Sequence, residues 1–138
     1  MGTQIFVNLP VKDLKKSIGF FTHLGYSFNP QFTDEKATCM IISENIFVML
    51  LVEPFFKSFI KKDIADASRT TEVILCLSAE SKKAVDDLVR KAVEAGGAIP
   101  NSQQDQGFMY SHGFEDLDGH LWEVMYMAAQ APAEAQAN

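Results

Sequence analysis

The feature that most restricts the fold is an internal repeat, in which the order strand, helix, three strands occurs twice within 138 residues. Strand patterns at residues 5–11 and 71–77 begin the two copies, and an apolar pattern with helical spacing follows each of them. The two strands align at a period of about 66 residues, which keeps the apolar face of each strand on its own helix. The repeat predicts an α+β protein made of two βαβββ modules.

The first module is predicted to cover residues 1–53. Asp13 is a suitable N-cap for its helix, and Gly25 is a suitable end. Pro10 cannot donate a hydrogen bond to a neighbouring strand, so strand 5–11 is expected at a sheet edge or to end there. The three strands that follow are predicted at about 26–32, 36–43 and 46–52.

The connector at residues 54–70 is predicted to contain a short helix, because Phe55, Phe56, Phe59 and Ile60 fall on one helical face. It leads to the second module.

The second module is predicted to cover residues 71–127. Ser78 could cap its helix, which ends near Gly96, and a short strand is expected at 98–101. Two further strands are predicted at 107–114 and 121–127, with Asp118-Gly119 as a two-residue hairpin turn between them. The two modules form one domain, residues 1–128. The tail, residues 129–138, is rich in Ala, Gln and Pro and is predicted to be disordered.

Composition excludes several classes of partner. The net charge is −6, and Lys and Arg form no basic stripe, so neither nucleic acid nor an anionic membrane is expected to bind. The longest apolar run, Ile46–Val52, is too short to cross a bilayer. The first residues lack the basic and long apolar regions of a secretory signal, so a cytoplasmic location is expected. Cys39 and Cys76 lie in apolar stretches and are predicted to be buried free thiols.

Two sequence motifs resemble those of a known family. The first runs from Val11 to Phe21 and continues with Leu24-Gly25-Tyr26, and the second runs from Phe114 to Glu123. With the repeat between them, they resemble the vicinal oxygen chelate superfamily, which includes glyoxalases, bleomycin-resistance proteins and dioxygenases. Leu117 stands where the family usually has proline. The resemblance implies two curled mixed sheets around a cavity, and a homodimer.

The resemblance also implies four positions that hold a divalent metal in enzymatic members. In this chain they fall at Phe6, at Met49 or Leu50, at Glu72 and at Glu123. Two of the four are therefore apolar, and phenyl or thioether groups do not replace the nitrogen and oxygen ligands of such metals. No cofactor is therefore the expectation. A divalent metal stays possible only through Glu72 and Glu123.

Glu72 and Glu123 are the lone charges in otherwise apolar strands and are the candidate catalytic residues. If both face one cavity, their repulsion raises one pKa, which suits acid–base chemistry, or the pair receives a cation. The candidate ligand-binding residues are Phe6, Asn8, Met49, His112 and Tyr110.

Three functions agree with these residues. The favoured hypothesis is a binding protein that sequesters a cationic or aromatic small molecule, as bleomycin-resistance proteins do. The second is a metal-dependent lyase or isomerase of the glyoxalase kind, or a dioxygenase, in which the metal polarises an oxygen. The third is a metal-free enzyme with Glu72 and Glu123 as an acid–base pair.

Overall fold

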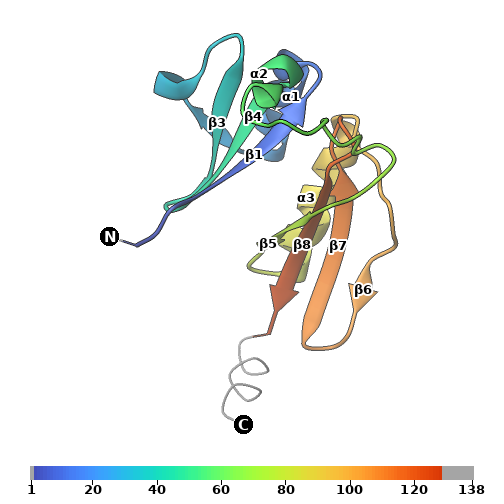
Figure 1. The fold of residues 1–138 in the computed structure, drawn as a ribbon. Coiled ribbons are helices and arrows are strands. Elements are labelled where there is room, and N and C mark those ends of the chain that lie inside the picture. Colours follow the sequence, from blue (N-terminus) through green and yellow to red (C-terminus); the bar gives the residue numbers. More distant parts are fainter. Residues whose placement is uncertain (1, 129–138) are drawn as a thin grey trace. The chain divides into compact units, whose positions relative to one another are not determined.

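The computed structural model describes residues 2–128 and separates into two compact units, Met1–Asp66 and Ala67–Asn138. Each unit contains one four-stranded mixed sheet with a long helix against it (Figure 1). This confirms the two predicted βαβββ modules. The predicted disorder of residues 129–138 concerns a segment outside the described residues.

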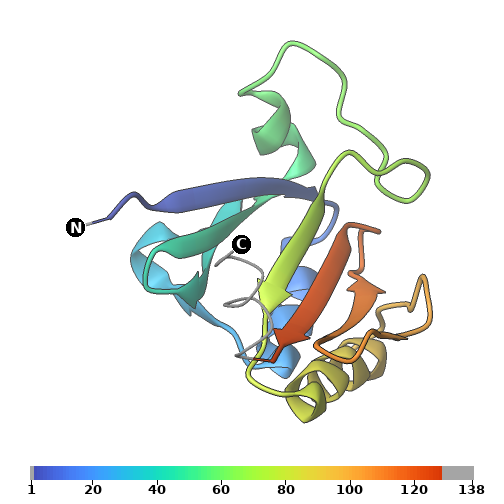
Figure 2. The same cartoon turned by 90° about the horizontal axis from the view of Figure 1, so that it is seen from below.

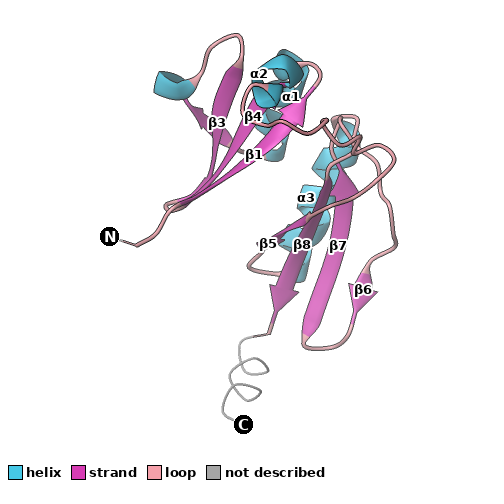
Figure 3. Ribbon diagram, in the orientation of Figure 1, coloured by secondary structure: helices cyan, strands magenta, loops and turns pink. Residues whose placement is uncertain are grey.

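The first unit has the strand order β1-β4-β3-β2, in which β1 is parallel to β4 and the other pairs are antiparallel (Figure 3). Its elements are β1 (Ile5–Val11), α1 (Leu14–Leu24), β2 (Ser27–Asn29), the 3-10 helix η1 (Pro30–Phe32), β3 (Ala37–Ser43), β4 (Ile46–Val52) and α2 (Glu53–Lys57). The strand predicted at 26–32 was too long, because Pro30 begins a 3-10 turn whose Gln31 amide donates to the Asn29 side chain. As predicted from Pro10, β1 is an edge strand.

The core of the first unit forms between α1 and one face of the sheet. Asp13 caps α1 by accepting a hydrogen bond from the Lys16 amide at 3.1 Å. Gly25 ends it with a φ of 106°, a left-handed conformation that favours glycine. The side chains of Phe21, Val48 and Leu50 are almost completely buried. Their burial fixes which face of β4 turns toward α1.

The second unit has the strand order β5-β8-β7-β6, again with one parallel pair, β5 and β8. Its elements are β5 (Ile74–Ser78), α3 (Lys82–Glu94), β6 (Gln104–Asp105), β7 (Met109–Glu115) and β8 (Leu121–Met127). In Figures 1 and 2, α3 lies against one face of this sheet, where it contacts β7 and β8.

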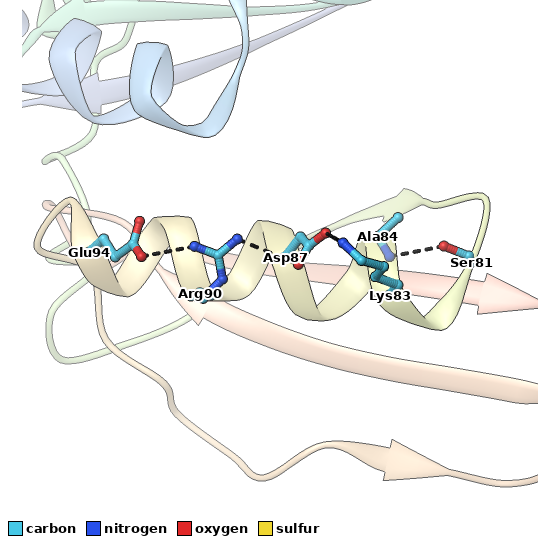
Figure 4. A network of polar contacts seen from close by, with 6 residues as sticks. All are labelled: Ser81, Lys83, Ala84, Asp87, Arg90 and Glu94. Atoms are coloured by element: carbon cyan, nitrogen blue, oxygen red, sulfur yellow. Dashed lines mark hydrogen bonds and ion pairs between the residues drawn. The ribbon is translucent and has the colours of Figure 1, made fainter.

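Helix α3 is amphipathic. Val85, Val89 and Ala92 are buried on its inner side. Its outer side carries a chain of ion pairs, formed by Lys83, Asp87, Arg90 and Glu94 (Figure 4). Each exposed pair of this kind contributes about 0.3–0.5 kcal/mol, so the buried stripe supplies most of the stability of the helix.

Several predictions for the second unit were wrong in detail. The N-cap of α3 is Ser81, which accepts from the Ala84 amide at 3.0 Å, whereas Ser78 is the last residue of β5. Ala98 makes only an isolated bridge to Glu115, and the short strand lies later, at Gln104–Asp105.

The β7–β8 turn is longer than the two residues predicted. Residues 116–120 connect the strands, and the Asp116 amide donates to the His120 carbonyl oxygen at 3.0 Å. Gly119 has a φ of 90°, which explains glycine at this point of the turn.

The two copies of the repeat are offset by 68 residues, not 66, where their helices begin. Asp13 and Ser81 are the N-caps, 68 positions apart, and the buried residues Ser17 and Val85 keep the same offset. None of the described helices has the length and apolar character needed to cross a membrane.

Candidate functional site

The face of each sheet that lies opposite its long helix, here called the far face, carries most of the candidate residues. Directly paired residues on neighbouring strands point to the same side of a sheet. In the first unit, Phe6 pairs with Phe47, and Asn8 pairs with Met49. These four residues alternate with the residues that face α1, so the predicted ligand residues Phe6, Asn8 and Met49 share the far face.

Phe6 and Phe47 form an aromatic platform on this face. Their ring centroids are 4.9 Å apart and the rings are nearly parallel, at 13°. Phe6 is 50% exposed, so one ring of the pair is available to another molecule. The Asn8 side chain donates to the Phe6 carbonyl oxygen at 3.1 Å, which leaves its amide oxygen as an acceptor.

A hollow of about 340 Å³ lies beside this platform. It is lined by Asn8, Leu51, Phe56, Phe59 and Ile60. The helical turn of α2 and the residues after it supply the aromatic side of this hollow. Helix α2 ends at Lys57, so the predicted helix was right in place but does not extend to Phe59.

The far face of the second sheet carries Glu123. Glu123 pairs with Cys76 on β5 and with Gly113 on β7, so these three residues point to one side. The neighbouring pairs on this side are Ile74 with Leu121 and Gln104 with Ser111. Cys76 is exposed, which corrects the prediction that both thiols are buried; Cys39 is buried as expected.

A second hollow, of about 360 Å³, lies over Glu123. It is lined by Ile74, Pro100, Asn101, Ser102, Gln104, Ser111, His112, Gly113, Leu121, Trp122 and Glu123. Glu123 is the only carboxylate among these residues, and none of them is Lys or Arg. Pro100, Asn101, Ser102 and Gln104 were not predicted as site residues; the first three lie in the segment before β6, and Gln104 lies in β6.

Gly113 allows the backbones of β7 and β8 to approach closely beside this hollow. It stands opposite Glu123, and a Cβ atom at Gly113 would lie 2.8 Å from the Trp122 carbonyl oxygen. No larger residue fits there without moving the backbone of β8, so glycine is required for this close approach of the two strands.

Tyr110 and His112 lie on the other side of β7, toward α3. Tyr110 pairs with Tyr126, and its hydroxyl donates to Asp86 of α3 at 2.6 Å. This hydrogen bond is the main cause that raises the pKa of Tyr110 to about 12. His112 pairs with Val124 and borders the hollow as a strand neighbour of Gly113. The structure therefore does not bring these two predicted ligand residues onto the face of Glu123.

Glu72 lies outside the strand on which it was predicted. Strand β5 begins at Ile74, and Glu72 is an exposed residue of the segment before it. Ile74, paired with Leu121, occupies the place in the second sheet that Phe6 occupies in the first. Glu72 is also absent from the lining of the hollow. The predicted carboxylate pair is thus not formed by neighbouring positions on β5 and β8.

Asp116 is a buried carboxylate whose role the sequence reasoning missed. It is 7% exposed and accepts hydrogen bonds from the amides of Asp118 and His120 and from the indole nitrogen of Trp122. Burial raises its pKa, although the charge of His120 and these hydrogen bonds favour the ionised form. The sequence feature that could have indicated this role is the spacing of Asp116 from Trp122 within the motif Phe114 to Glu123. Its partners show a structural role at the turn.

The residues at the implied metal positions do not fit a divalent metal. Phe6 and Met49 offer no oxygen or nitrogen ligand, and Glu72 precedes its strand. Among residues 2–128, no three His, Cys, Asp or Glu side chains come together in a group that could hold a metal ion.

Comparison with known proteins shows which proteins this chain is similar to. Residues 3–43 match the model of the bleomycin resistance protein-like N-terminal family. A hypothetical protein of S. aureus is similar over 91% of this chain and 95% of its own, with 30% identity and a TM-score of 0.77. The chain belongs to the vicinal oxygen chelate superfamily. A comparison with curated protein sequences gives no significant match.

Two further solved structures share the fold at lower identity. A glyoxalase/bleomycin resistance protein/dioxygenase family enzyme from Burkholderia phytofirmans has a TM-score of 0.75 and 14% identity, over 91% of this chain and 99% of its own. An antibiotic binding protein from Streptomyces has a TM-score of 0.66 and 14% identity, over 93% and 98%.

Proposed function

We propose that this protein binds a small organic molecule that carries an aromatic or cationic group, and that it does so without catalysing a reaction. The observation that carries the proposal is the composition of the far faces. One carries the stacked pair of Phe6 and Phe47, and the other carries Glu123 as the single carboxylate of its hollow. The fold shared with an antibiotic binding protein supports the same direction.

The physical basis is ordinary recognition of flat and charged molecules. An aromatic ligand that stacks on Phe6 would remove the exposed half of that ring from water and gain about 0.5–1.5 kcal/mol from ring geometry. A cationic ligand is attracted by the net charge of −6, and Glu123 gives it a local partner. Neither role needs a metal or a second catalytic group.

Titration calorimetry with bleomycin and with the planar cation rhodamine 6G tests the proposal. We expect saturable binding of at least one probe at micromolar concentration. Phe6→Ala should weaken the binding of rhodamine by about tenfold, which corresponds to about 1.4 kcal/mol. Phe32→Ala is the matched control, because Phe32 is also exposed, at 60%, but belongs to η1.

Two outcomes would contradict the proposal. If neither probe binds at high micromolar concentration, the antibiotic-binding version is wrong. If Phe32→Ala weakens binding as much as Phe6→Ala does, binding is nonspecific adsorption to exposed rings.

We further propose that the protein forms a homodimer. Strands β1 and β2 are the edges of the first sheet, and β5 and β6 are the edges of the second, and an unpaired edge can accept another chain. Sedimentation velocity over a range of concentrations should give a species of twice the chain mass, and a single monomeric species at all concentrations would refute this.

A further inference from the structure

We propose that the hollow of the second sheet is a binding site for an alkylammonium or alkylguanidinium group, with Glu123 as its counter-ion. This inference rests on the proposed function and names the chemistry of one part of the ligand. It adds polar residues to a site of which the sequence indicated Glu123 and His112: Asn101, Ser102, Gln104 and Ser111.

The lining of the hollow accepts hydrogen bonds at many points and carries one negative charge. Glu123 contributes a carboxylate, and the amide oxygens of Asn101 and Gln104 and the hydroxyls of Ser102 and Ser111 are further acceptors. An ammonium group has three N–H donors and no acceptor, so it matches such a lining. A carboxylate or phosphate would instead meet Glu123 without any lysine or arginine in the lining.

The lysine that contacts β6, Lys82, is engaged elsewhere. Lys82 lies 3.1 Å from Asp105 and 5.7 Å from the ring centre of Tyr110. Asp105 pairs with Tyr110, which points toward α3, so this ion pair belongs to the opposite side of the sheet. Lys82 therefore does not neutralise Glu123 from within the hollow.

The remaining walls suit a short apolar chain. Ile74, Leu121 and Pro100 supply apolar surface beside the carboxylate. The volume of about 360 Å³ lies at the lower end of the range for small-molecule pockets. The hollow thus has room for a small alkylamine or for the basic arm of a larger molecule.

The negative charge of Glu123 acts on the neighbouring thiol of Cys76. The pKa of Cys76 is raised by burial first and by the negative charge of Glu123 second. Cys76 is the strand neighbour of Glu123, so the two side chains share one local environment. A cation that binds Glu123 would relieve this repulsion.

The test is a titration of the ¹⁵N-labelled full chain, followed by amide chemical shifts. The probes are n-butylammonium and n-butylguanidinium, and the controls are 1-pentanol, which is neutral, and pentanoate, which is an anion. We expect the two cations to shift the amides of Asn101, Ser102, Gln104, Gly113 and Glu123, with smaller shifts at higher salt. Neither control should do so at equal concentration.

The matched variants are Glu123→Gln and Glu80→Gln. Both remove one negative charge, and Glu80 is an exposed residue after β5 that does not line the hollow. Glu123→Gln should weaken the binding of butylammonium by about tenfold, or about 1.4 kcal/mol, whereas Glu80→Gln should leave it within twofold. The amide spectra of both variants show directly whether each is folded.

Several outcomes would overturn the inference. Equal shifts with 1-pentanol would mean that the hollow binds by apolar contact alone, and shifts with pentanoate would reverse the proposed charge preference. Equal losses in both variants would mean that only net charge matters. If bleomycin or rhodamine 6G binds the same sample while butylammonium does not, the ammonium site is wrong and the proposed function stands. If no probe binds, both fail.

Discussion

Replacing Asp116 with alanine should destabilise the second unit more than any other single change in the β7–β8 turn. The carboxylate accepts from the Trp122 indole at 2.9 Å and from the amides of Asp118 and His120 at 3.0 Å each. Trp122 is completely buried, so its indole N–H has no access to water once the carboxylate is gone.

The magnitude follows from these three donors. A buried donor without an acceptor costs about 1–3 kcal/mol, which applies to the Trp122 indole. The two turn amides can be partly rehydrated and lose about 0.5–1 kcal/mol each. Removing a buried carboxylate also recovers part of its desolvation cost. The net loss in free energy of unfolding should be about 2–4 kcal/mol.

Urea denaturation followed by far-UV circular dichroism measures this loss. Asp118→Ala is the matched control, because Asp118 is a half-buried aspartate of the same turn and the variant keeps the Asp118 amide; it should cost less than Asp116→Ala does. In a double-mutant cycle, Trp122→Phe removes the indole donor. The loss in free energy of unfolding in the double variant should therefore be smaller than the sum of the losses in Asp116→Ala and Trp122→Phe. Full additivity, or a loss below about 1 kcal/mol for Asp116→Ala, would refute the reasoning.

The pH dependence has a definite sign. The folded-state pKa of Asp116 is raised, so protonation favours the folded state. The contribution of this group to stability is full below the ordinary aspartate pKa and is lost as pH rises through the raised value. The difference in stability between wild type and Asp116→Asn should therefore shrink as pH rises through that window. A difference that grows instead would mean that the carboxylate prefers to be ionised in the fold.

Three further changes test other features of the chain. Gly113→Ala should lower the free energy of unfolding by about 1–3 kcal/mol, because its Cβ would lie 2.8 Å from the Trp122 carbonyl oxygen; thermal melting measures the loss, and an unchanged melting temperature contradicts it. Ellman's reagent should label only Cys76 in the folded protein, slowly at pH 8 because its pKa is raised, with Cys39 protected; labelling that survives Cys76→Ser would contradict this. Ser81→Ala should cost about 1 kcal/mol in urea denaturation through loss of the α3 cap, and no loss would assign the cap elsewhere.

Where a mostly apolar stretch runs between turn residues, the sequence was sufficient to predict the strand. The predicted strands 5–11, 46–52 and 121–127 agree with β1, β4 and β8 to the residue. The errors lie where local hydrogen bonds compete with that pattern. Pro30 starts a 3-10 turn, and the Asp116 side chain turns a predicted two-residue hairpin into a five-residue connection.

The candidate site shows a limit of strand periodicity itself. Offsets of 66 and 68 have the same parity, so both keep Leu75 and Leu77 on the side of the helix, and no face pattern distinguishes them. The N-caps of the two helices do distinguish them, because Asp13 and Ser81 are 68 positions apart, and this offset aligns Phe6 with Ile74 instead of Glu72.

The direction of the Glu123 side chain could be predicted from the sequence for a physical reason. It lies inside a long strand between two residues, Trp122 and Val124, whose burial against α3 fixes its direction. Glu72 has no such buried neighbours, because the strand starts two residues later and Val73 is 54% exposed. A charged residue at the start of an apolar run therefore predicts a strand boundary at least as well as a catalytic position. A charge flanked on both sides by buried residues, as Glu123 is, is the stronger indication of a site.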